Sequence, residues 1–196
     1  NIDNNTYKGR DSNKNRTSKY IIDALGGPET LKDKEVLDLA CASGAILFEV
    51  RNFIKKGTGA DVDDKKLNVG KDIISEHNIE NISLHNIRLE QFLVKENKQK
   101  YDCIFLLNII HHLHKPREAL DLVAEISNNL ICIEAPKEGF YNPYPRDEKL
   151  PTPSMALSIA DIDAHLSSRG FKLVNKIKSE NQENFMGPEG DYERYV

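Results

Sequence analysis

The sequence has no tryptophan, only three cysteines and no long hydrophobic run among its 196 residues. No apolar stretch approaches the roughly 18 residues that a membrane-spanning helix requires, and the polar start is unlike a secretory signal peptide. We therefore expect no membrane segment. The cysteines are odd in number, and each lies in or beside an apolar segment: Cys41, Cys103 and Cys132. This usage favours reduced thiols in a cytoplasmic protein over a disulfide framework.

The chain also lacks an excess of positive charge. Its 27 Lys and Arg residues are outnumbered by 31 Asp and Glu residues, so the net charge is −4. Nucleic-acid-binding proteins usually present a basic surface, so this balance makes nucleic acid a possible but not a favoured partner. The exception is a polar arm, residues 1–16, in and just after which five cations gather: Lys8, Arg10, Lys14, Arg16 and Lys19. These cations fit a solvated tail or a contact with phosphate groups equally well.

Beyond the arm, strand and helix patterns alternate along residues 17–196, which we interpret as one domain. The strands are almost continuously apolar, which is typical of a parallel sheet covered by helices on both faces. The sequence therefore predicts an α/β fold with a doubly wound, mostly parallel sheet. The predicted strands are 36–39, 58–61, 82–85, 103–107, 130–135 and 171–177, the last forming an edge hairpin with 192–196. The predicted helices are 17–25, 45–56, 65–77, 116–127 and 159–169.

One segment, residues 136–153, has neither a helical nor a strand period. It contains five prolines and three aromatic residues, Phe140, Tyr141 and Tyr144. A long loop without secondary structure inside a compact domain is usually functional. Because it follows the fifth predicted strand, we expect a lid over a ligand at the carboxyl edge of the sheet. Tyr141 is its candidate catalytic residue.

Residues 35–44 carry the most informative pattern: an apolar strand, a turn of small residues and the start of a helical segment. Side chains no larger than Cys at 40–44 let the backbone approach a ligand, and a helix N-terminus offers unpaired N–H groups. Such a unit forms a nucleotide-sized site at the carboxyl end of a parallel sheet. Asp38 at the strand end would repel a pyrophosphate but suits a ligand with an ammonium or sulfonium charge.

This stretch resembles the first motif of class I S-adenosylmethionine (SAM)-dependent methyltransferases, an acidic residue followed by Gly-x-Gly-x-Gly. Ala40 and Ala42 stand in place of the first two glycines, and Gly44 keeps the third. The resemblance covers nearly the whole chain from about residue 17. It implies SAM as cofactor and a seven-stranded sheet of order 3-2-1-4-5-7-6 whose last strand is antiparallel. In this motif the implied cofactor residues are Asp38, Ala40, Cys41, Ala42 and Gly44.

Further cofactor residues are expected at the ends of other strands. Asp61 lies 17 residues after Gly44 at the end of the second strand, where a carboxylate can accept both hydroxyls of a ribose. The resemblance implies the same role for it. It also places Arg88 where the family commonly has an acid that binds the adenine amino group. The other residues that it implies are Val62, Leu89, Asn108, Ile109 and, for the cofactor carboxylate, Arg16.

Three histidines follow the fourth strand: His111, His112 and His114. We expect neighbouring His111 and His112 to point apart on a helix, so that at most a pair such as His111 and His114 faces one side. No cysteine or glutamate lies nearby in sequence to complete a tetrahedral metal site, and we predict no metal. A general base and a packing role remain open for His111 and His112.

Four functions compete. A methyltransferase fits best, because the chemistry needs mainly alignment of an acceptor, and a small-molecule acceptor is favoured over the alternative, RNA of the tRNA-modifying type. A SAM-binding protein of the same fold without turnover is a further alternative, because two motif glycines are replaced. A nicotinamide-dependent oxidoreductase is the fourth possibility, because residues 40–45 can be aligned with the glycine motif of that class. Asp38 and the absence of a Tyr-x-x-x-Lys pair after the fourth strand count against it.

Overall fold

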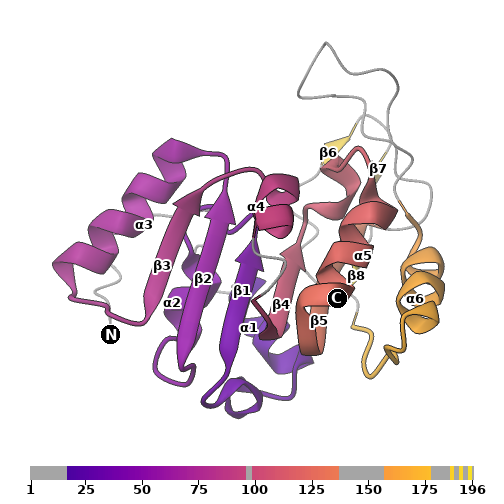
Figure 1. Cartoon of the computed structure of the whole chain (residues 1–196), viewed down its shortest axis with the longest axis horizontal. Coiled ribbons are helices and arrows are strands. Elements are labelled where there is room, and N and C mark those ends of the chain that lie inside the picture. Colours follow the sequence, from indigo (N-terminus) through magenta and orange to yellow (C-terminus); the bar gives the residue numbers. More distant parts are fainter. Residues whose placement is uncertain are drawn as a thin grey trace.

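The computed structural model describes residues 17–95, 99–136, 157–177, 186–187, 190–191 and 194–195. Strands and helices alternate over most of this length (Figure 1). The helices are α1 (Thr17–Ala24), η1 (Pro28–Leu31), α2 (Ala45–Val50), α3 (Asp64–Glu76), α4 (Leu89–Lys95), η2 (Ile110–His112), α5 (Pro116–Ile126) and α6 (Ile159–Ser168). The strands are β1 (Glu35–Leu39), β2 (Lys56–Asp61), β3 (Ile82–Asn86), β4 (Tyr101–Leu107), β5 (Ser127–Pro136), β6 (Met186–Gly187), β7 (Gly190–Asp191) and β8 (Arg194–Tyr195).

The main sheet has the order β3-β2-β1-β4-β5-β8. Its first five strands are parallel, which confirms the doubly wound α/β fold and the predicted order of these strands. In the β1–β2 and β1–β4 registers, Asp38 lies opposite Gly59 on one side and Phe105 on the other. All five strands end at one edge of the sheet, so the residues that follow them gather there.

The outer edge beyond β5 differs from the expected order. Residues 171–177 form no β-ladder with any described strand, so the prediction of a sixth strand there is wrong. Instead, β8 pairs antiparallel with Ala135 and Pro136 at the end of β5. The physical reason lies in burial. Leu173 and Val174 are 57% and 82% exposed, so the apolar alternation gains no buried face, and Asn175 donates its side-chain N–H to the Ala24 carbonyl.

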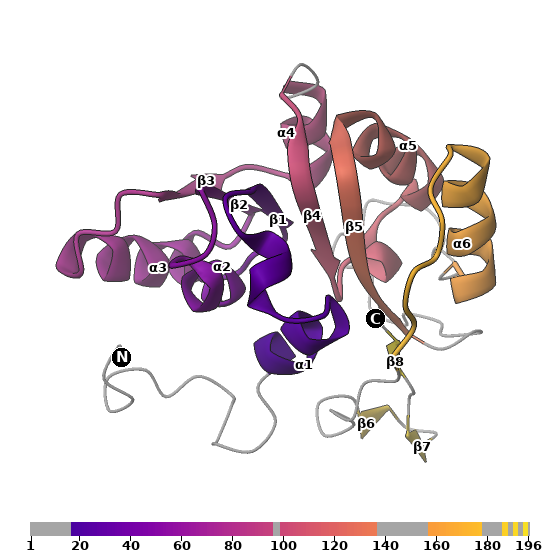
Figure 2. The same ribbon diagram turned by 90° about the horizontal axis from the view of Figure 1, so that it is seen from below.

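Helices cover both faces of the sheet (Figure 2). One core cluster joins the sheet to α1, α2 and α3 through Ile21, Leu47 and Leu67. A second joins it to α4 and α5 through Leu93 and Val123. A third, smaller cluster links α6 to α5 and η2. The predicted two-layer cover is therefore present around the five parallel strands.

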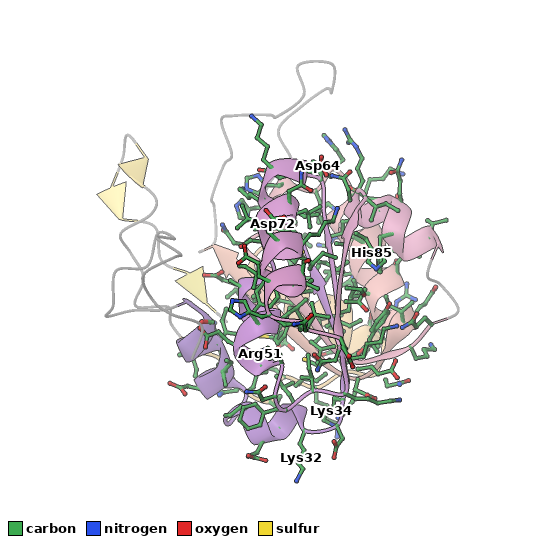
Figure 3. The ribbon with its side chains drawn as sticks, turned by 90° about the vertical axis from the view of Figure 1, so that its left-hand side faces the viewer. Lys32, Lys34, Arg51, Asp64, Asp72 and His85 are labelled. Carbon is green, nitrogen blue, oxygen red and sulfur yellow. The ribbon has the colours of Figure 1, made fainter. Side chains whose placement is uncertain are left out.

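Two helices differ from expectation. The helix predicted over 45–56 ends at Val50, because the Asn81 side chain donates to the carbonyls of Arg51 and Ile54 and closes a turn there. Figure 3 shows Arg51 below α3, on the side of the molecule that also carries Lys34. Helix α4 was not predicted. It buries Leu89 and its neighbours in the second core cluster. Because it has only seven residues, its sequence is too short to show a helical hydrophobic period.

Candidate cofactor site

The turn between β1 and α2 has the backbone of a glycine motif although two glycines are missing. Ala40 and Ala42 have positive φ angles of 65° and 52°, and Gly44 has one of 81°. These are the three motif positions. Left-handed backbone is free for glycine but strained for alanine, so the chain retains this shape at an energetic cost. Hydrogen bonds hold it: the N–H groups of Ala40 and Cys41 both donate to the Ala60 carbonyl, at 2.8 and 3.2 Å.

Two glycines outside the motif let other elements approach this turn. A Cβ on Gly70 of α3 would lie 2.3 Å from the Ser43 carbonyl oxygen. A Cβ on Gly59 of β2 would lie 2.7 Å from Cys41 Sγ. The turn therefore rests directly on α3 and β2, which fixes its position relative to the strand ends. The role of Gly70 could not be predicted, because an isolated glycine in a helical sequence carries no signal of what it contacts.

Asp61, at the end of β2, binds the turn. Its Oδ2 accepts the Ala42 N–H at 2.8 Å, and its Oδ1 accepts the Asp63 N–H at 2.8 Å. A carboxylate oxygen has a second lone pair, so each oxygen can still accept a ribose hydroxyl. The half-buried carboxylate thus has a structural role that the sequence did not predict, and this role orients it for the predicted one.

Asp38 lies beneath the turn and is only 3% exposed. Neither a hydrogen bond nor an ion pair joins its carboxylate to the described residues. Burial, and then the charge of Asp61, raise the pKa of Asp38 to about 7. Burial destabilises the charged form of an unpaired carboxylate. A cation bound next to Asp38 would offset most of this destabilisation.

Asn108 follows β4 and lies at the same edge of the sheet, because β1 and β4 are neighbours. Its backbone is left-handed, with φ of 55°, and its N–H donates to the Glu134 carbonyl at 3.2 Å. Its side-chain Oδ1 is buried and meets no donor among the described residues. Asp38 and Asn108 thus offer acceptors to a donor that the described chain does not supply. An ammonium group, with three donors and a positive charge, matches both.

The residues expected around the base follow β2 and β3. The Ile87 N–H donates to the Asp61 carbonyl at 2.9 Å, which brings the ends of these two strands together. Val62 is exposed, whereas Leu89 is buried against the sheet at the start of α4. Arg88 is exposed. It stands where an acid would accept a hydrogen bond from the adenine amino group, and an arginine side chain cannot accept one. Leu89 therefore belongs to the core beneath these strand ends, and Val62 is an exposed apolar residue beside them.

The histidines do not point apart as predicted. They lie in the short turn η2, where the ring centroids of His111 and His112 are 4.1 Å apart at an interplanar angle of 42°. The prediction assumed an α-helix, whereas η2 is a single 3-10 turn of three residues, so the α-helical side-chain directions do not apply to this pair. His111 is 2% exposed, His112 is half-buried and His114 is exposed. Within the described ranges, no three His, Cys, Asp or Glu side chains gather closely enough to hold a metal ion.

One acidic residue at this edge was not predicted. Glu134 is buried near the end of β5, opposite Leu107 of β4, and its carbonyl holds Asn108 in place. It lies near the end of an apolar strand, where the sequence alone does not show whether an acidic side chain is buried or exposed. Ile109 follows Asn108 and is half-buried. Two predicted site residues, Arg16 and Tyr141, lie outside the described residues, as do the arm and most of the lid segment.

A separate groove of about 980 Å³ runs between β5, α6 and residues 171–176. It contains none of the predicted site residues. It follows the outer edge of β5, where the expected sixth strand is not formed, and its walls include Leu130 and Phe171. We assign it to this incomplete sheet edge and not to the cofactor.

A doubly wound sheet with polar groups at the carboxyl ends of its strands is typical of nucleotide-binding domains, and comparisons with known proteins identify the family. The methyltransferase domain family matches residues 31–189. The ubiquinone biosynthesis O-methyltransferase of Pseudoalteromonas translucida (strain TAC 125) is 27% identical over 111 residues, 55% of this chain and 44% of that protein. The chain thus spans less than half the length of this curated relative.

Solved structures share the fold. The magnesium protoporphyrin IX methyltransferase from Synechocystis PCC 6803, solved with bound SAM, has a TM-score of 0.67 at 15% identity and covers 91% of this chain and 76% of its own. The N-methyltransferase NodS from Bradyrhizobium japonicum WM9 has a TM-score of 0.66 at 13% identity, covering 91% and 92%.

The chain belongs to the methyltransferase domain family. The predicted resemblance to class I SAM-dependent methyltransferases is confirmed, and SAM is the cofactor of this class. In the part of the chain that the structure describes, no helix is long and apolar enough to cross a membrane.

Proposed function

We propose that this chain binds SAM at the carboxyl edge of β1, β2 and β4 and transfers its methyl group to a small-molecule acceptor. The observation that carries the proposal is Asp38, a buried carboxylate without a partner among the described residues, beneath a turn with three left-handed positions. A cationic, nucleotide-sized ligand satisfies both features. The nicotinamide alternative does not, because its pyrophosphate would bring negative charge toward Asp38.

Each polar group of the site then has a role. Asp38 and Asn108 Oδ1 receive the ammonium group of the cofactor, and Asp61 receives the two ribose hydroxyls. Val62 and Leu89 cover the adenine. Bound SAM supplies an electrophilic sulfonium methyl group, so the chain mainly has to hold an acceptor in line with it. Arg16 stays a proposed partner of the cofactor carboxylate.

An acceptor hydroxyl or amine loses a proton when it is methylated, and His112 is the residue that we propose as its base. His112 is half-buried and therefore reachable, whereas His111 is 2% exposed and stacks against it. The proton passes from the acceptor to the His112 imidazole, while the acceptor takes the methyl group. His111 orients the His112 ring. Neither step uses a metal ion, and we predict activity in the presence of a chelator.

Two observations support a small acceptor. The curated relative is named for ubiquinone biosynthesis and a structural neighbour for magnesium protoporphyrin IX, both small molecules. The net charge of −4 also does not favour nucleic acid. RNA remains the alternative acceptor, since the cations of the arm fit a phosphate backbone. The lid over 136–153, with Tyr141 in it, and a cytoplasmic location remain predictions.

Calorimetric titration tests the cofactor. SAM is expected to bind and NAD is not. Asp61→Ala should lose a charge-assisted contact with the ribose, lowering affinity by roughly 1.5–3 kcal/mol. Asp72→Ala is the matched control, because Asp72 is an exposed carboxylate of α3 (Figure 3) and should leave the affinity unchanged. Equal SAM affinity in the Asp61 and Asp72 variants would refute the assignment of Asp61.

The acceptor is tested with methyl-labelled SAM and fractionated cell extract. Label is expected in the small-molecule fraction, and it should persist when EDTA is added. Label in the RNA fraction alone would instead support the alternative acceptor. Binding of SAM without label in any fraction would favour the SAM-binding protein without turnover.

A further inference from the structure

The two carboxylates of the site have opposite surroundings. Asp61 receives a backbone N–H on each oxygen, which stabilises its negative charge. Asp38 is 3% exposed and receives no hydrogen bond from any described residue. The charged form of one carboxyl group is therefore supported by the fold, and the charged form of the other is not. A group in the second position is more stable when it is protonated.

Burial and the charge of Asp61 both oppose the charged form of Asp38, and no ion pair joins Asp38 to a cation among the described residues. Its face of the sheet is packed against α1 and α2, whose core residues there are apolar, such as Ile21 and Leu47. Several acids and thiols lie on the adjoining strands and the turn: Asp61 of β2, Cys41 of the turn, Cys103 of β4, and Cys132 and Glu134 of β5. Lys56 of β2 lies at the other end of the strand, opposite Glu35. Burial raises the pKa of all three thiols, which therefore stay neutral.

We infer that Asp38 holds a proton in the ligand-free protein and releases it when the ammonium group of the cofactor arrives. The inference rests on the proposed function, and it adds that Asp38 makes cofactor binding a proton-releasing step. The balance is simple: a carboxylic acid and an ammonium ligand become an ion pair, and one proton passes to the solvent. Asp38 thereby selects the cationic amino-acid end of the cofactor, and its affinity depends on pH.

The size of the effect follows from the ionised fraction of Asp38. Its pKa of about 7 leaves roughly a tenth of the groups ionised at about pH 6 and nine tenths at about pH 8. Apparent affinity scales with the fraction of the protein that is competent to bind, so it should rise about tenfold over this range. The sign is an increase with pH, because the ligand binds the deprotonated form. At about pH 8 the ligand's own amino group also begins to lose its proton, which keeps the observed rise below this tenfold value and lowers the affinity at higher pH.

Calorimetry at about pH 6.5 in two buffers of different protonation enthalpy counts the released protons. The probes are S-adenosylhomocysteine, which carries the ammonium group without the sulfonium charge, and 5′-methylthioadenosine, which lacks the whole amino-acid end. We expect S-adenosylhomocysteine to release most of one proton and 5′-methylthioadenosine to release none. Asp38→Asn should bind S-adenosylhomocysteine more weakly and release none, whereas Asp72→Asn should behave as the unmodified protein does.

His112→Gln tests the histidine to which the proposed function assigns a proton-accepting role. If that variant lost the proton release while Asp38→Asn kept it, the histidine would be its source and the inference would be overturned. Equal proton release by both probes would overturn it as well, without requiring any variant to fold. Tight binding of S-adenosylhomocysteine with no proton released refutes the role of Asp38 but leaves the proposed function intact. Failure of both SAM and S-adenosylhomocysteine to bind refutes the proposed function itself.

Discussion

Replacing Ala42 by glycine should stabilise this protein. Ala42 has φ of 52°, in a region where an L-residue other than glycine is strained by roughly 1–2 kcal/mol. The hydrogen bond from its N–H to Asp61 uses the backbone and is retained by glycine. Glycine also loosens the unfolded chain, which costs about 0.4–1 kcal/mol. The difference predicts a gain of about 0.5–1 kcal/mol in the free energy of unfolding.

Urea denaturation followed by circular dichroism measures this gain, and the melting temperature should rise by about 1–4 °C for a domain of this size. Ala160→Gly is the matched control. Ala160 is an exposed residue in the first turn of α6 and is not among the residues with positive φ, so glycine there should destabilise by at most about 1 kcal/mol. Opposite signs for the two variants are therefore expected. If Ala42→Gly destabilised the protein as Ala160→Gly does, the left-handed conformation at position 42 would be wrong.

Three further changes test other parts of the site. Gly70→Ala should cost about 1–3 kcal/mol of stability and weaken SAM binding, because its Cβ meets the Ser43 carbonyl at 2.3 Å; an unfolding curve like that of the unmodified protein would contradict this contact. Asp38→Asn should stabilise the ligand-free protein at about pH 8 by up to about 4 kcal/mol. A carboxyl pKa raised to about 7 means stability that is present at low pH and lost as pH rises toward 7. Urea denaturation at pH 5 and pH 8 checks this, and a loss of stability at pH 8 would count against an unpaired Asp38. Replacing Tyr141 and Tyr144 by Ala should weaken acceptor use while SAM affinity stays unchanged in calorimetry; normal turnover would remove the lid from the proposal.

Local sequence patterns were sufficient for the central sheet. The apolar runs that became β1 to β5, and the order in which they lie, followed from strand and helix periodicity together with the resemblance. The acid at 38, the small-residue turn and the acid at 61 were likewise visible, because their spacing along the chain is the signal. The periodicity failed where an element had little to bury: residues 171–177 expose Leu173 and Val174, and the seven residues of α4 are too few to show a period.

What the sequence by itself determined is the site's inventory, a strand-turn-helix unit with carboxylates at two strand ends. Only the tertiary structure decided how those groups stand. It set Ala40 and Ala42 into left-handed backbone, which their N–H groups hold by donating to the Ala60 carbonyl and the Asp61 carboxylate. Among the described residues it gave Asp61 two N–H donors and Asp38 none, and it brought the His111 and His112 rings together. The charge state of a side chain and the strain of a backbone segment depend on neighbours from other helices and strands. A local sequence pattern contains no information about those neighbours.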